Sequence, residues 1–381
     1  MKLQFDPTID YVREGVAMLQ YFCSTDADKT LVEIMRKNDP LIHFSKEDLE
    51  LMAGYDRFLA HVRQQLALSE DELKLLEHDY THEEGETDVR ASVLFPCYHA
   101  SGMTLEEVIA RIESLDEGTL RAYFLTLTLN IETIEDGASV SINEFMQYVL
   151  DAPAWTAQYR CHILNTFLDY HASFAKATPI LARLIKVIQE SESMIRKDLD
   201  EWAEQTLIHM NKDTDSPFLT RLSTIIPIIE EKDLTMIVRP TIATPASVVI
   251  FMYVVDGDTG LFGSRSNCSI NVGLGFYKMD TNLTKRSDHL TDEELQQALK
   301  TIADKSKFDI LTILRDEHCY AAQLANRLSL SPATISYHMS ALVSRQLVSV
   351  GMGSEEKKLY YQLNTGRIKK IAESLLSTFV R

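Results

Sequence analysis

Side chains that can hydrogen-bond a base edge or a phosphate gather on one face of a helix predicted near residue 335. Because its residues are small, uncharged or hydroxyl-bearing, this face can enter the major groove of DNA. We expect Thr334, Ser336 and Tyr337 to contact bases or phosphates, with His338 at the edge of the groove. The candidate DNA-binding residues of this segment are Ser331, Ala333, Thr334, Ser336, Tyr337 and His338, and Ser340 shares their face.

The residue order predicts where this helix begins and which side of it is buried. Ser331 is a good N-cap, because its hydroxyl can accept a hydrogen bond from an unpaired amide of the first turn. Pro332 follows at the first helical position, where a missing N–H costs nothing. Ile335, Met339 and Leu342 then recur at helical spacing, so this side of the helix should belong to a hydrophobic core.

The segments on either side complete a winged helix-turn-helix pattern. Residues 321–328 form a short amphipathic helix, and residues 329–330 make a tight connection to the next helix. Downstream, residues 347–350 and 358–363 have the alternation of strands. Glycines between them predict a hairpin, or wing, at residues 351–358.

Charge is distributed unevenly along the chain. Arg345 follows the predicted helix, and Lys357 and Lys358 lie at the base of the wing, where each would add salt-dependent phosphate affinity. Residues 285–381 hold 14 Lys and Arg against 11 Asp and Glu, a net charge of +3. Residues 1–284 hold 24 basic and 45 acidic residues, a net charge of −21, which repels a phosphate backbone. The pattern predicts a DNA-binding domain at 285–381 joined to an acidic domain at 1–284.

From Thr291 to Phe379 the chain resembles the ArsR-type, or arsenic-repressor-like, winged helix-turn-helix regulators. The resemblance depends on the order and spacing of these segments: 299–304, 308–311, 323–325, 330–331 with 336–342, 347–348 and 359–363. It implies a transcriptional regulator that binds double-stranded operator DNA.

The resemblance also implies a homodimer, because the first and last helices of the domain build a two-fold interface in that family. This chain has matching apolar stripes on its first helix (Leu295, Leu299 and Ile302) and on its last (Ile368, Ile371, Leu375 and Phe379). The alternative is that both stripes pack inside one subunit, against the acidic domain.

The metal-sensing residues of the family are replaced in this chain. Many members carry a Cys-x-Cys pair at the positions that Tyr320 and Ala322 occupy here, and Cys319 lies one residue off without a second thiol. The last helix contains no His and a single acidic residue, Glu373, so the second metal site of the family also lacks its ligands. Sensing zinc or arsenic needs several converging ligands. We therefore expect no metal and no cofactor.

The acidic domain should be mostly helical with a small β-rich part at about 233–279. Capping boxes at Ser69, Thr104, Ser141 and Thr291 each precede a helical pattern. Residues 153–210 should be helical, with a break at Thr178–Pro179. Residues 235–240 and 247–255 are β-branched and aromatic, which predicts a small sheet or a long hairpin. The expected fold class is mainly α with small β, ending in a winged helix-turn-helix.

Motifs for catalysis are weak. His78 and His82 lie in an acidic stretch without a metalloprotease order, so a solvated loop is favoured. Cys161 beside His162 carries no nucleophile signature, so a buried small hydrophobe is favoured. A string of aromatic residues could line a ligand pocket, although ordinary core is favoured: Trp155, Tyr159, Phe167, Tyr170, Phe174 and Trp202.

Composition favours a cytoplasmic protein. The five cysteines are scattered and odd in number, no apolar run approaches the length of a membrane span, and the N-terminus lacks a signal-peptide pattern. The sequence thus predicts a non-enzymatic regulator whose acidic domain receives a small-molecule or protein signal. Two alternatives stay open. One is an enzyme with an appended regulatory winged helix, and the other is a protein-interaction module that never touches DNA.

Overall fold

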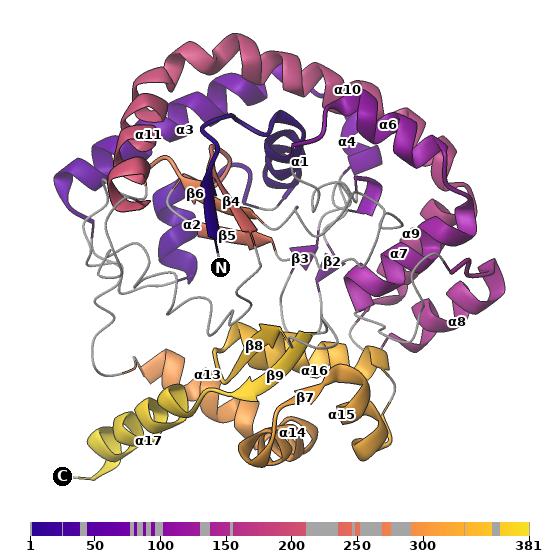
Figure 1. Cartoon of the computed structure of the whole chain (residues 1–381), viewed down its shortest axis with the longest axis vertical. Helices are drawn as coiled ribbons and strands as arrows, with labels where there is room; N and C mark the ends of the chain where they lie inside the picture. Colours follow the sequence, from indigo (N-terminus) through magenta and orange to yellow (C-terminus); the bar gives the residue numbers. More distant parts are fainter. Residues whose placement is uncertain are drawn as a thin grey trace.

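The computed structural model describes residues 2–24, 26–38, 44–76, 80–81, 87–88, 93–95, 102–129, 138–152, 155–210, 235–245, 248–251, 269–275, 290, 292–330, 332–352 and 359–380. N-terminal helices form a broad arch around a small sheet, and the C-terminal elements lie below the open side of the arch (Figure 1). The expectation of a mainly helical chain with small sheets is confirmed. His78 and His82 lie outside the described residues.

The described helices of the arch follow one another along the chain. They are α1 (Tyr11–Phe22), α2 (Leu31–Asn38), α3 (Lys46–Leu66), α4 (Glu70–Leu76), α6 (Leu105–Glu113), α7 (Glu117–Leu129), α8 (Ile142–Asp151), α9 (Ala157–Leu168), α10 (Tyr170–Ser191) and α11 (Arg196–Met210). Helix α10 runs along the outer arc and packs against α1 and α3 (Figure 1). Buried hydrophobic residues from Val12 to Leu274 form one cluster, which we call the N-terminal core.

Reciprocal side-chain bonds cap several of these helices as expected. Thr104 and Glu107 exchange hydrogen bonds with each other's backbone amides, and so do Ser69 and Glu72. Ser141 accepts a bond from the Glu144 amide at 3.3 Å. Thr291 lies outside the described residues. Ser45 and Asp48 form a further box at the start of α3, and Thr30 and Glu33 exchange the same pair of bonds at the start of α2. Neither was predicted from the sequence.

The expected helix break at Thr178–Pro179 is wrong. Pro179 lies inside α10, which continues to Ser191, and the chain breaks instead at Asp169 and after Ser191. A proline removes one helical hydrogen bond, but buried packing on both sides of it outweighs that loss. Ala177, Ile180 and Leu181 are all buried.

A mixed four-stranded sheet forms the centre of the arch. Its order is β1 (Lys2–Phe5), β4 (Thr235–Thr241), β6 (Ser269–Gly273) and β5 (Val248–Phe251). Strands β1, β4 and β6 are parallel, and β5 pairs antiparallel with β6. A small sheet was expected here. The alternative of a long hairpin between residues 235–240 and 247–255 is wrong, because β6 lies between β4 and β5. A two-stranded pair, β2 (Tyr80–Thr81) with β3 (Thr87–Asp88), lies apart from it.

Buried charged side chains tie the sheet to α1. The Glu14 carboxylate accepts hydrogen bonds from the Ile242 amide at 2.8 Å, the Ala243 amide at 2.7 Å and Thr241 Oγ1 at 3.1 Å. Burial away from water raises the pKa of Glu14 to about 7, although these donors oppose the shift. The neighbouring Arg13 donates to Asn271 Oδ1 at 2.8 Å. The amides that follow β4 are therefore satisfied by a residue of α1.

The C-terminal elements build a winged helix with its own core. They are α13 (Asp292–Ala303), α14 (Lys305–Asp316), β7 (Cys319–Tyr320), α15 (Ala321–Leu328), α16 (Pro332–Ser344), β8 (Val348–Met352), β9 (Leu359–Leu363) and α17 (Thr365–Phe379). The strands form a sheet of order β7-β9-β8. Buried residues from Leu290 to Ile371 form the winged-helix core. Helix α17 runs outward, with the C-terminus of the chain at its end (Figure 1).

Candidate nucleic-acid interface

Helices α15 and α16 meet at a tight turn. Ser329 ends α15 in the left-handed conformation, with a φ of 54°. The amides of Ser329 and Leu330 both donate to the Ala325 carbonyl, which closes the last turn of the helix. Leu324 and Ala325 are buried, so α15 is fixed to the winged-helix core by one face. This arrangement is a helix-turn-helix.

The core side of α16 lies where the spacing predicted. Ile335, Met339 and Leu342 are each at most 1% exposed and belong to the winged-helix core. The helix begins at Pro332, as expected, and Ser331 itself lies outside the described residues. The register of α16 is therefore set by its apolar residues.

The face expected to bind DNA is partly covered in this structure. Thr334 is half-buried, and Tyr337 is half-buried against the N-terminal core. His338 is 8% exposed, so it is buried rather than at an open edge. The ammonium group of Lys307 lies 5.4 Å from the centre of the Tyr337 ring. For Ala333, Ser336 and Ser340 the structure describes the backbone of α16 only.

The wing is described at its base. Strand β8 pairs antiparallel with β9, from Val348 opposite Leu363 to Met352 opposite Leu359. Arg345 is exposed just after α16, where its guanidinium is accessible. Lys357 and Lys358 lie outside the described residues, so their phosphate contacts stay predictions.

Of the two positions that carry the Cys-x-Cys ligands in the resembling family, Tyr320 lies in the small sheet and Ala322 lies in α15, while Cys319 is one residue off. Cys319 is fully buried opposite Tyr361, and Tyr320 is opposite Tyr360. Burial raises the pKa of the Cys319 thiol, which keeps it protonated. Among the described residues, no three His, Cys, Asp or Glu side chains converge into a metal site.

The aromatic string of the N-terminal domain is core, as the sequence favoured. Trp155, Tyr159, Phe167, Tyr170, Phe174 and Trp202 are all at most 8% exposed. The expectation that Cys161 is a buried small hydrophobe is wrong: Cys161 is exposed, whereas the neighbouring His162 is buried with its Nε2 3.5 Å from Thr166 Oγ1.

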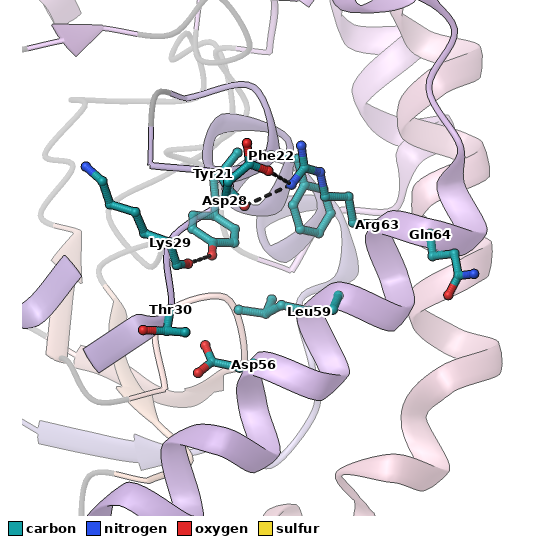
Figure 2. Close-up of a pocket in the computed structure, with 11 residues that line it drawn as sticks. Tyr21, Phe22, Asp28, Lys29, Thr30, Asp56, Leu59, Arg63 and Gln64 are labelled. Atoms are coloured by element: carbon teal, nitrogen blue, oxygen red, sulfur yellow. Dashed lines mark hydrogen bonds and ion pairs between the residues drawn. The ribbon is translucent and has the colours of Figure 1, made fainter. Parts of the chain in front are cut away.

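A cavity of about 500 Å³ lies elsewhere, between the end of α1, the following loop and α3 (Figure 2). Tyr21, Phe22 and Leu59 supply apolar lining, and the Tyr21 hydroxyl donates to the Lys29 carbonyl at 2.9 Å. Asp56 lies at the lower end in the view and accepts from the Leu31 amide at 2.9 Å. Burial raises the pKa of this carboxyl group.

At the other end of the cavity, Arg63 pairs with Asp28 at 2.7 Å and donates to the Ala27 carbonyl (Figure 2). The sequence analysis missed this cavity. Its lining comes from segments that meet only through tertiary packing, so no local pattern in the sequence predicts it.

The elements from α13 to α17 define the class of protein, a winged helix-turn-helix transcriptional regulator that binds DNA. The family model for "Bacterial regulatory protein, arsR family" matches residues 304–350. The arsenical resistance operon repressor of Staphylococcus aureus is 32% identical over 83 residues, which are 22% of this chain and 78% of that protein. The repressor of the same name from Staphylococcus xylosus matches to the same extent. On this likeness, the chain belongs to the arsR family of bacterial regulatory proteins.

One solved structure is similar to part of the chain. Reduced HlyU from Vibrio cholerae is 24% identical, covers 26% of this chain and 99% of its own, and has a TM-score of 0.19. The matches to the repressors likewise concern about a fifth of the chain, so they describe the C-terminal elements rather than the helical arch. None of the helices in the described residues combines the length and apolar character needed to cross a membrane.

Proposed function

We propose that the protein binds operator DNA as a homodimer and that its N-terminal domain, residues 1–284, receives a non-metal signal. The observation that carries the proposal is the helix-turn-helix of α15 and α16. Its apolar residues fix α16 to the winged-helix core, and the face that carries Thr334 and Tyr337 is the one we assign to DNA. Thr334, Ser336 and Tyr337 would contact bases or phosphates, while Arg345, Lys357 and Lys358 would add phosphate contacts from the domain at 285–381.

Exposed apolar residues on α17 support the homodimer. Leu376, Phe379 and Val380 are 58%, 74% and 64% exposed at the outer end of this helix. Nearer its start, Ile371 is only 5% exposed and packs in the winged-helix core, where α17 contacts α13. The apolar stripe is thus shared between the subunit's own core and a surface that a second copy would cover.

The cavity between α1 and α3 supports a small-molecule signal. Its size lies within the range of ligand sites, and it joins apolar lining to charged groups at both ends. A protein effector is the alternative. We place the protein in the cytoplasm, where operator DNA is found.

A salt titration of the full chain tests DNA binding. Fluorescence anisotropy of a labelled duplex, measured over a range of salt concentrations, should give an affinity that falls steeply as salt rises, because binding releases counterions from phosphates. Absence of binding even at low salt, from a folded protein, would leave the protein-interaction module as the better account. Turnover of a small molecule by the same preparation would favour the enzyme with an appended regulatory domain.

A further inference from the structure

One face of α16, the proposed recognition helix, is turned toward the arch. In Figure 1, α16, β8 and β9 form the side of the winged helix nearest the N-terminal helices, and α14 and α15 lie on the far side. Helix α16 contacts α7 of the arch. Among the hydrophobic side chains of the described winged helix, Tyr337 is the one that packs against the N-terminal core. The same residue is a central member of the candidate DNA-binding face.

DNA and the arch cannot occupy this face together. An α-helix with its side chains is roughly 10–12 Å across, and the major groove is about 12 Å wide. A helix in the groove therefore fills it, and α7 has no room beside the same face. The arch also belongs to a region of charge −21, so holding it against a duplex would add repulsion between like charges.

We infer that the contact between α16 and α7 is an autoinhibitory interface: the N-terminal domain covers the recognition helix, and DNA binding requires the two to separate. The inference rests on the proposed DNA-binding function and names how that function is regulated. The apparent association constant for DNA equals the intrinsic association constant multiplied by the fraction of molecules in the open form. A signal that binds the open form better than the closed form would raise that fraction.

The interface between α16 and the arch can separate at little cost. From α16, the hydrophobic side chain described in this interface is Tyr337, which is half-buried. Ile335, Met339 and Leu342 instead pack in the winged-helix core and hold α16 in its own domain. Separation would therefore expose little apolar surface and leave both cores intact. The N-terminal core and the winged-helix core are separate clusters, and Tyr337 is the hydrophobic residue of the described winged helix that packs against the N-terminal core.

Hydrogen–deuterium exchange of the full chain, with and without a mixed-sequence duplex at low salt, tests the inference. With DNA bound, amides of α16 should exchange more slowly, and those of α7 should exchange faster because they lose their cover. Protection of α16 with no change or added protection in α7 would overturn autoinhibition while leaving DNA binding in place. No protection of α16 would overturn the proposed function, and the inference with it.

A variant gives a second, independent readout. Tyr337→Ser removes the ring that packs against the N-terminal core, and loss of the phenol hydroxyl should matter little on random duplex, which offers no specific base to read. Its affinity for random duplex should rise by about tenfold, which corresponds to roughly 1.4 kcal/mol less stabilisation of the closed form. The matched control is Phe308→Ser, which removes an exposed ring of α14 and should leave the affinity unchanged. Equal or weaker random-duplex binding by Tyr337→Ser would contradict a closed state held by this residue.

Discussion

Lys307 and Tyr337 are joined by a cation–π contact, with the Lys307 ammonium 5.4 Å from the centre of the tyrosine ring. Lys307 lies in the first turn of α14 and is 6% exposed, so a buried cation of one helix lies over an aromatic ring of the recognition helix. Such a contact contributes about 0.5–2 kcal/mol, depending on how far the cation is removed from water. The contact restricts the position of the ring. A restricted ring suits a residue that contacts bases in the major groove or packs against the N-terminal domain.

Tyr337→Phe distinguishes the contribution of the hydroxyl group from that of the ring. The variant keeps the cation–π contact and loses only the O–H, so operator binding should weaken while random-duplex binding stays the same. A direct base contact is worth about 1–3 kcal/mol, which predicts a loss of operator discrimination of roughly five- to 150-fold. Gel-shift titrations on both DNAs measure it.

Tyr337→Ala should also reduce discrimination between operator and random DNA. An equal loss of affinity on operator and random duplexes for either variant would contradict a base-reading role for this residue.

Lys357→Ala should weaken binding to operator and random DNA by similar factors. The side chain is expected to contact phosphate, which carries no sequence information. The slope of log affinity against log salt should fall by about one. Lys369→Ala, in α17, is a matched loss of one positive charge and should have a smaller effect. A sequence-dependent loss for Lys357→Ala would show that the wing reads bases.

Phe379→Asp should turn a dimer into a monomer. The ring is 74% exposed at the end of α17, so the substitution leaves the subunit core undisturbed and places a charge in the proposed interface. Sedimentation equilibrium should show the change in mass, with weaker operator binding at the same protein concentration. Phe308→Asp, a comparable substitution at an exposed ring of α14, should remain dimeric. A monomeric native protein would contradict the proposed interface.

The buried Glu14 should make the N-terminal domain less stable as pH rises. Its pKa is about 7 in the folded chain, above its ordinary value of 4.5, so the folded state holds a proton that the unfolded state has released between these values. Stability from this group is therefore complete below about pH 4.5 and is lost as pH rises to 7, at up to about 1.4 kcal/mol per pH unit.

Glu14→Gln keeps an oxygen that can accept from the Ile242 and Ala243 amides and removes the titration. Thermal unfolding between pH 5 and 8 should show a flatter pH dependence for the variant than for the native chain. Parallel curves would show that Glu14 has no raised pKa.

Local sequence patterns were sufficient for the winged helix. Ile335, Met339 and Leu342 predicted the register of α16 because helical spacing alone decides which residues share a face. The end of α15 required only a tight connection at Ser329–Leu330. These features depend on interactions between residues that are close in the sequence, so short segments are enough to predict them.

Long-range relationships were not accessible in the same way. Strand β1 pairs with β4, more than two hundred residues later in the chain, and a four-residue strand carries too weak a pattern to predict that partner. Pro179 was expected to end a helix because the cost of proline is local, whereas the packing that outweighs it comes from α1 and α3. Tyr337 looked like part of an open polar face because nothing in its own segment indicates α7.

Selection of bound sites from a random duplex pool by the full chain tests the central claim most directly. We predict enrichment of pseudo-palindromic sites whose half-sites lie one helical turn apart, about 34–36 Å, as two recognition helices of a dimer require. Enrichment should be lost with Tyr337→Ala, while Phe308→Ser should retain the same sites. A folded, full-length protein that enriches no sequence over the starting pool would contradict the account.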